Sequence, residues 1–138
     1  MASLLKLAGC ILTDGRGSVL LIHRNHHGRI QWEIPGGKIE PGESDIETVT
    51  REAKEELACG IKVTKRLGDK DFKEDEHTFH YTWFAAHVTE DSPKIGEPDK
   101  YDGIGYFNQD DLEQMRDELS PNTVNFLDSW RRGKIGIS

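Results

Sequence analysis

Apolar residues gather in short segments that predict strands. The turn residues 14–17 (DGRG) stand between two such segments, at 4–13 and 18–23, and predict a hairpin. Residues 78–89 are apolar at both odd and even positions, which is typical of a central strand covered on both faces. The strands expected from these patterns lie at 4–13, 18–23, 61–68, 78–89 and 104–108.

A different spacing predicts helices. Apolar residues recur every three or four positions between Ile46 and Leu57, which predicts an amphipathic helix over about 44–58. Ser120-Pro121 predicts the start of a last helix that ends near Arg132, because proline is favoured at the first helical position. The remaining segments are predicted as a short helix at 110–118, a polar loop at 25–31, a charged turn at 69–77 and an acidic loop at 90–102.

These elements favour an α/β fold, with a mixed β-sheet between helices. The 138 residues suffice for one hydrophobic core, so we expect a single domain over residues 1–138. Cys10 and Cys59 are too few for a disulfide scaffold, which makes a reducing cytoplasm the expected compartment. No segment is apolar over the length that a membrane span needs.

The net charge of −7 argues against nucleic acid and anionic membranes as partners. A polyphosphate substrate would also be repelled unless cations were bound. Glu52, Glu55 and Glu56 fall on one arc of the helix predicted at 44–58, where like charges three or four residues apart cost about 0.2–0.5 kcal/mol per pair. Hard cations such as Mg²⁺ take oxygen ligands and suit this cluster. The alternative is a solvated acidic face on which Arg51 pairs with Glu47 and Glu55.

The loop before this helix is rich in turn residues. Pro35 bars a helix, and Gly36-Gly37 allows the backbone to turn tightly and to approach a ligand closely. Pro41-Gly42 predicts a second turn, and Ser44 or Asp45 can cap the helix. The segment is therefore loop, helix, loop, with a glycine bend beside the carboxylates.

This segment resembles the signature of the Nudix hydrolases, G-x5-E-x7-R-E-U-x-E-E-x-G-U, where U is a bulky aliphatic residue. The six leading fixed positions are filled by Gly37, Glu43, Arg51, Glu52, Glu55 and Glu56. Two positions depart from the pattern. Ala53 is small for an aliphatic site, and Ala58 stands where the signature has glycine, so we expect Gly60 to supply the left-handed helix cap.

The resemblance implies a Nudix-like α/β/α sandwich and hydrolysis of a phosphoanhydride bond with Mg²⁺, for which Mn²⁺ can substitute. By position, Glu52 and Glu56 are expected to bind the metal, with Glu55 as a third ligand and the Gly36 carbonyl as a further one. Glu52 is also expected to be the general base. In the same comparison, Arg51 orients Glu43, which supports the loop or the metals.

Signals outside the signature leave alternatives open. Glu97 resembles an additional metal-binding glutamate of the family, or is a solvated loop carboxylate. Arg24 either contacts a phosphate or ribose, or is a surface arginine. Asn122 resembles a base-reading asparagine, or is a polar residue of a first helical turn. Four aromatic residues either stack on a base or belong to the core, namely Trp32, Phe79, Tyr81 and Trp83.

The resemblance favours the antimutator-type group, which hydrolyses nucleoside triphosphates, 8-oxo-dGTP among them, to a monophosphate and pyrophosphate. The first alternative within the family is cleavage of ADP-ribose or another nucleoside diphosphate compound, although the ADP-ribose group typically carries a proline where this chain has Glu74. Diadenosine polyphosphate enzymes carry a tyrosine that residues 75–77 lack. A non-catalytic nucleotide-sensing or protein-binding module is the alternative from another class. We expect a small-molecule nucleotide as partner and either a monomer or a homodimer.

Overall fold

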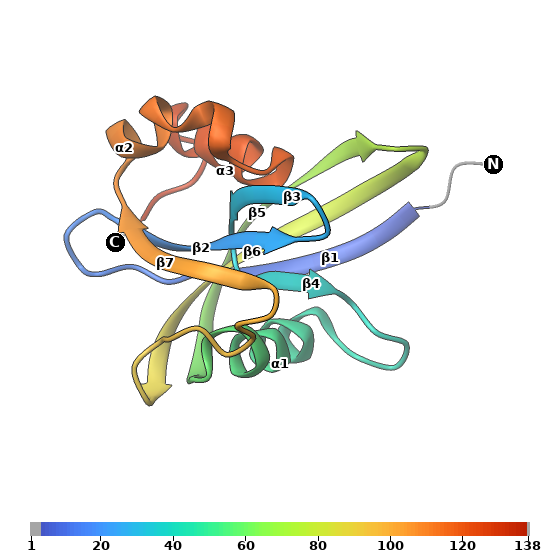
Figure 1. Ribbon diagram of the computed structural model, residues 1–138, viewed down its shortest axis with the longest axis vertical. Coiled ribbons are helices and arrows are strands. Elements are labelled where there is room, and N and C mark those ends of the chain that lie inside the picture. The colour runs from blue at the N-terminus through green and yellow to red at the C-terminus, as the bar shows by residue number, and fades with distance from the viewer. Residues whose placement is uncertain (1–3, 138) are drawn as a thin grey trace.

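The computed structural model describes residues 4–137, and its strands form two sheets that lie between helices (Figure 1). One sheet has the strand order β4-β1-β6-β5 and the other β3-β2-β7. The strands are β1 (Leu4–Ile11), β2 (Val19–His26), β3 (Arg29–Glu33), β4 (Gly36–Lys38), β5 (Gly60–Glu74), β6 (His77–Glu90) and β7 (Tyr101–Phe107). The helices are α1 (Asp45–Leu57), α2 (Gln109–Gln114), the single 3₁₀ turn η1 (Arg116–Glu118) and α3 (Pro121–Arg131).

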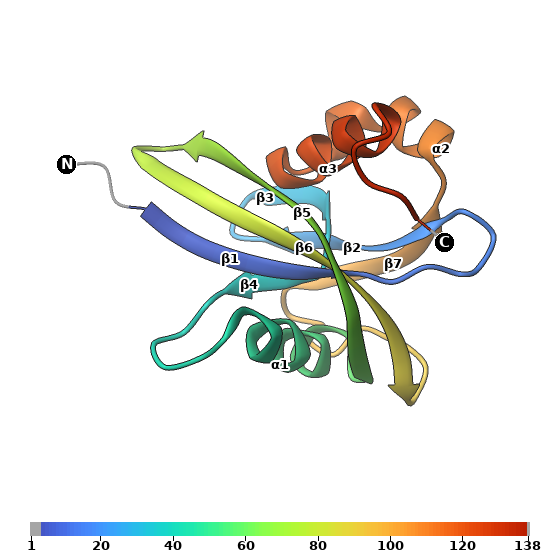
Figure 2. The same ribbon diagram turned by 180° about the vertical axis from the view of Figure 1, so that it is seen from behind.

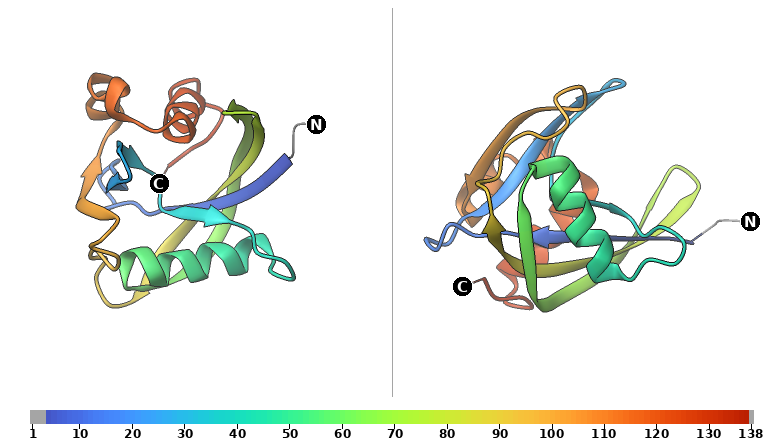
Figure 3. Two further views of the ribbon diagram at one scale, coloured as in Figure 1. Left: turned by 45° about the vertical axis from the view of Figure 1, so that its right-hand side comes forward. Right: turned by 90° about the horizontal axis from the view of Figure 1, so that it is seen from below.

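Helix α1 covers one side of the sheets, and α2 and α3 cover the other, as Figures 2 and 3 show. The four-stranded sheet is mixed, because β1 runs parallel to β6 while its other pairs are antiparallel. The three-stranded sheet is antiparallel throughout. The expected α/β architecture with helices on both faces is therefore confirmed. No helix in residues 4–137 is both long enough and apolar enough to cross a membrane.

The central strand expected at 78–89 is confirmed as β6, which pairs with β1 on one side and β5 on the other. Consecutive residues of β6 enter two different cores. Phe84 packs in the cluster under α1, whereas Trp83 packs in the cluster under α3. Both side chains are nearly inaccessible, which explains why β6 is apolar at successive positions.

The hairpin expected from 4–13 and 18–23 is only partly formed. Its turn closes, since the Asp14 N–H donates to the Ser18 carbonyl and Thr13 bridges to Val19. Beyond the turn β1 and β2 separate into different sheets. Each strand has a better partner elsewhere, because β1 lies against β6 and β2 against β7.

Two segments predicted as irregular are strands. Residues 25–31 form the β2–β3 hairpin, whose turn residues His27 and Gly28 both have positive φ, as a two-residue hairpin turn requires. The charged turn expected at 69–77 is also wrong, because β5 continues to Glu74. This half of β5 is an edge strand with exposed charges, so it lacks the apolar pattern that marks a buried strand.

Helix α1 has the predicted start but a different end. Ser44 is its N-cap and forms a reciprocal capping box with Glu47. The expectation that Gly60 supplies the left-handed cap is wrong, since Ala58 itself adopts φ 51° and ψ 36°. Gly60 is instead the first residue of β5, so the chain turns at the position where the signature has glycine.

Candidate active site

The acidic residues of helix α1 differ widely in how far they are buried. Its apolar side is formed by Val49, Ala53 and Leu57, which are packed in the core. Glu56 lies beside them and is only 4% exposed, whereas the side chain of Glu55 is 46% exposed. Glu52 lies between these extremes, with a side chain that is 14% exposed. Three glutamates that look alike in the sequence therefore occupy three different environments.

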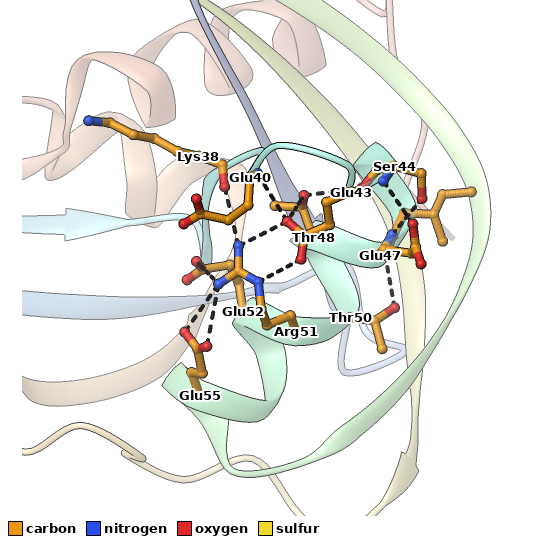
Figure 4. A network of polar contacts seen from close by, with 11 residues as sticks. Lys38, Glu40, Glu43, Ser44, Glu47, Thr48, Thr50, Arg51, Glu52 and Glu55 are labelled. Atoms are coloured by element: carbon orange, nitrogen blue, oxygen red, sulfur yellow. Dashed lines mark hydrogen bonds and ion pairs between the residues drawn. The ribbon is translucent and has the colours of Figure 1, made fainter.

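Arg51 joins the loop to the helix by contacts with three carboxylates (Figure 4). Its Nε and Nη2 donate to the two oxygens of Glu43, at 2.7 and 3.1 Å. Its Nη1 donates to Glu52 at 2.8 Å and, at 3.3 Å, to Glu55. One guanidinium thus offsets the repulsion among like charges on one helix face.

Glu43 is held in the ionised state. The Arg51 guanidinium and the Thr48 hydroxyl both donate to it, and together they lower the pKa of Glu43 to about 2. The Glu40 N–H also donates to Glu43, which fixes the turn at Pro41-Gly42. These contacts tie Glu43 to the turn before the helix and to the helix itself.

Glu56 is held by neutral donors. The Gly36 N–H donates to its Oε1 and the Tyr101 hydroxyl to its Oε2, both at 2.8 Å. Burial raises the pKa of Glu56 well above its usual range, and the charge of Glu52 raises it further. A cation bound beside Glu56 would remove this penalty, since a buried carboxylate is costly without an opposite charge.

The tight turn expected at Gly36-Gly37 is wrong, because both residues are extended and begin β4. This segment, for which we keep the name glycine bend, passes directly over Glu52. A Cβ at Gly37 would lie 2.6 Å from Glu52 Oε1, which is closer than a non-bonded carbon and oxygen approach each other. A Cβ at Gly36 would collide with the Ala8 carbonyl and the Tyr81 hydroxyl. Gly36 therefore needs glycine because backbone atoms pack closely against it, whereas a side chain at Gly37 would displace the Glu52 carboxylate.

The loop before β7 brings Glu97 to the helix. The N–H of Gly96 donates to the Glu56 carbonyl, and a Cβ at Gly96 would collide with the Glu55 carbonyl. Burial raises the pKa of Glu52, and the charges of Glu55 and Glu97 raise it further, against the opposing effect of Arg51. Glu97 thus belongs to the same acidic cluster, forty residues beyond the helix.

A cleft of about 410 Å³ opens on the other side of the glycine bend. Arg24 and Asn122 both line it, together with Gly36 and Gly37. Phe72 and Phe79 also line it and stack at 5.2 Å between ring centroids. Basic, acidic and amide side chains complete the wall, namely Arg29, Gln31, Glu33, Lys38 and Glu74.

The aromatic candidates separate into two groups. Phe79 and Tyr81 line the cleft. Trp83 is a core residue whose indole N–H donates to Asn122 Oδ1 at 3.0 Å, and Trp32 packs against Phe107 and His23. Phe72 was not among the candidates from sequence, since it lies in a segment predicted to be a turn.

The donor set suits a hard cation, since Glu52, Glu55, Glu56, Glu97 and the Gly36 carbonyl all offer oxygen. Within residues 4–137, however, no group of three His, Cys, Asp or Glu side chains is arranged as a ready metal site. The contacts explain this, because Arg51 occupies oxygens of Glu52 and Glu55. The residues fit a divalent cation in their chemistry, and such a cation would share these oxygens with Arg51.

Comparison with known proteins gives a consistent result. The model of the NUDIX domain matches residues 5–129. A Nudix hydrolase of Yersinia pestis, itself uncharacterised, is 24% identical over 125 residues, which cover 87% of this chain and 67% of that protein. A Bacillus subtilis protein provisionally named 8-oxo-dGTP diphosphatase is 33% identical over 51 residues, 35% of this chain and 34% of that one. The crystal structure of a MutT NUDIX hydrolase from Burkholderia pseudomallei superimposes with a TM-score of 0.80 and 27% identity, over 91% of this chain and 96% of that one.

Proposed function

This chain belongs to the Nudix family of hydrolases, and we propose that it cleaves a nucleoside triphosphate to a nucleoside monophosphate and pyrophosphate. One observation carries the proposal. The cleft that holds Arg24, Asn122 and a stacked aromatic pair ends at Gly36-Gly37, and the acidic cluster of α1 lies directly behind that bend. A base and a polyphosphate therefore have adjoining sites of the right chemistry.

We assign the metal to the acidic cluster. Glu52 and Glu56 would hold it, with Glu55, Glu97 and the Gly36 carbonyl as further ligands. Bound Mg²⁺ or Mn²⁺ would neutralise phosphate oxygens and lower the pKa of a bound water. Because the protein carries a net charge of −7, the phosphates need this neutralisation before they can approach.

Glu52 is the proposed general base. It is mostly buried, its pKa is raised mainly by burial, and it contacts the glycine bend that borders the cleft. In the reaction a water oxygen bonds to phosphorus at the α–β bridge while the bond to the bridging oxygen breaks. The phosphate group on the far side of the bridging oxygen leaves with that oxygen and the electron pair, and the Glu52 carboxylate takes the water proton. Arg51 fixes the position of Glu52, and Glu43 fixes Arg51.

The orientation of Asn122 favours a base that accepts a hydrogen bond. An indole N–H only donates, so the atom of Asn122 next to Trp83 must be Oδ1. Asn122 lines the cleft and has its amide NH₂ left to donate. A carbonyl edge such as O6 of guanine matches that donor, while the amino group of adenine does not.

Incubation with Mg²⁺ and a panel of nucleotides, followed by chromatography of the products, tests the proposal. We expect guanine triphosphates, oxidised or not, to yield monophosphate and pyrophosphate faster than adenine triphosphates. AMP and ribose phosphate from ADP-ribose would overturn the triphosphate assignment. Retained nucleotide binding without turnover would identify a non-catalytic module instead.

A further inference from the structure

Tyr101 connects the cleft wall to the acidic helix. It begins β7, is 2% exposed, and is the cross-strand partner of Arg24 on β2. The register of the two strands shifts between His23 and Arg24. Such irregularities re-aim side chains, and here the Arg24 guanidinium lies over the Tyr101 ring at 4.9 Å.

The hydrogen bonds of Tyr101 have only one possible direction. Arg24 Nη2 lies 2.8 Å from the phenol oxygen, and a guanidinium can only donate. The phenol therefore accepts from Arg24 and must give its own hydrogen to Glu56 Oε2, also at 2.8 Å. The chain of donors runs from Arg24 through Tyr101 to Glu56.

Glu56 is fixed at both oxygens by this arrangement. The Gly36 N–H holds Oε1 and the phenol holds Oε2, so the carboxylate cannot turn without losing one of the two bonds. Each carboxylate oxygen accepts more than one hydrogen bond or ligand, which leaves capacity for a cation. Without the phenol, Oε2 would be a buried acceptor with no donor.

The other end of the chain lies in the cleft. Arg24 Nε donates to Glu33 at 2.8 Å, and Gln31 donates to the same carboxylate oxygen at 2.6 Å. All three side chains line the cleft, whereas Tyr101 and Glu56 lie behind them. A movement of Arg24 would therefore alter the hydrogen bond that Tyr101 donates to Glu56.

We propose that Tyr101 is a positioning residue, which orients Glu56 for the metal and links it to the nucleotide cleft through Arg24. This inference rests on the proposed function of Glu56 as a metal ligand. Tyr101 itself contacts neither metal nor substrate in this scheme. Partners that orient a metal ligand typically contribute 10–100-fold to metal affinity.

Titration of the full chain with Mn²⁺ alone, followed by electron paramagnetic resonance of the free ion, tests the proposal. We expect Tyr101→Phe to weaken Mn²⁺ binding about 10–100-fold. Tyr106→Phe is the matched control, since it removes a phenol from an exposed position of the same strand and should leave the affinity unchanged. At saturating Mn²⁺ the KM for nucleotide should change little, while kcat falls.

Arg24→Lys provides a second variant in case Tyr101→Phe does not fold. It keeps the charge but loses the fork that holds Glu33 and Tyr101 together, so Mn²⁺ affinity should fall less than in Tyr101→Phe. In the double variant the two losses should not add, because both act on one chain of bonds. Wild-type affinity in a folded Tyr101→Phe protein would overturn the inference alone. A wild-type protein that neither binds Mn²⁺ nor cleaves nucleotides would overturn the proposed function.

Discussion

Glu43 and Glu56 are the first and last glutamates of one signature, yet their surroundings shift their pKa values in opposite directions. Glu43 is held by the Arg51 charge, which lowers its pKa to about 2. Glu56 is held by an amide and a phenol, both neutral, and burial raises its pKa. The contacts of Glu43 use its charge to fasten the loop, while the hydrogen bonds of Glu56 come from neutral groups.

This difference indicates which carboxylates of the acidic cluster would gain most from a bound cation. A carboxylate already neutralised by arginine gains little from a cation. A buried carboxylate with neutral donors gains much, since burial makes an unpaired charge costly. By the same argument, Glu52 should gain more from a cation than Glu43 and less than Glu56. Like Glu43 it accepts a hydrogen bond from Arg51, but like Glu56 it has a raised pKa.

The largest effect is expected from Glu52→Gln. The amide keeps the shape of the side chain but cannot take a proton, so turnover should fall by about 10³-fold with the fold intact. Steady-state kinetics with circular dichroism would measure both. Glu40→Gln is the control, since it removes an exposed carboxylate of the neighbouring loop and should leave turnover unchanged. Near-normal turnover in Glu52→Gln would remove Glu52 as the base.

Gly37→Ala should have the next largest effect. The added methyl would displace the Glu52 carboxylate, and a shift of about 1 Å in a reacting group costs on the order of 10²-fold. Gly136→Ala serves as a control, because its methyl would meet open space. Full turnover in Gly37→Ala would show that the reaction does not depend on where the glycine bend holds the Glu52 carboxylate.

The sequence predicted those parts of the fold that depend on local patterns. The helix at α1 and the buried strand β6 follow from the spacing of apolar residues, and both were found within a few residues of the expected bounds. The separation of β1 and β2 into two sheets depends on pairing between distant strands. The edge half of β5 has no apolar face, so nothing in its sequence distinguished it from a turn.

The candidate site divides in the same way. A fixed spacing on one helix was enough to group Glu52, Glu55 and Glu56. Tyr101 is 45 residues from Glu56 along the chain, and only the pairing of β2 with β7 brings it between Glu56 and Arg24. The pKa is lowered for Glu43 and raised for Glu52 and Glu56, and this difference depends partly on burial. Burial could not be predicted from sequence here, because all three residues are glutamates.

Glu43→Gln should change the dependence of stability on pH. The folded-state pKa of Glu43 is about 2 and its ordinary value is 4.5, so the ionised group contributes stability above pH 4.5 that is lost as the pH falls toward 2. Glutamine keeps an acceptor oxygen but does not titrate. Urea unfolding between pH 2 and 5 should therefore show a shallower loss of stability in the variant. Equal slopes in the two proteins would contradict the assigned role of Arg51.

The smallest effect should be a gain in stability from Ala58→Gly. Ala58 has φ 51°, a conformation that costs a residue with a Cβ about 1 kcal/mol and costs glycine almost nothing. Glycine is also what the signature has at this position. Ala53→Gly is the matched control with the opposite sign, because Ala53 lies inside α1, where glycine is about 1 kcal/mol less favourable than alanine. Thermal unfolding of both variants would measure the difference, and a loss of stability in Ala58→Gly would mean that the helix does not end at Ala58.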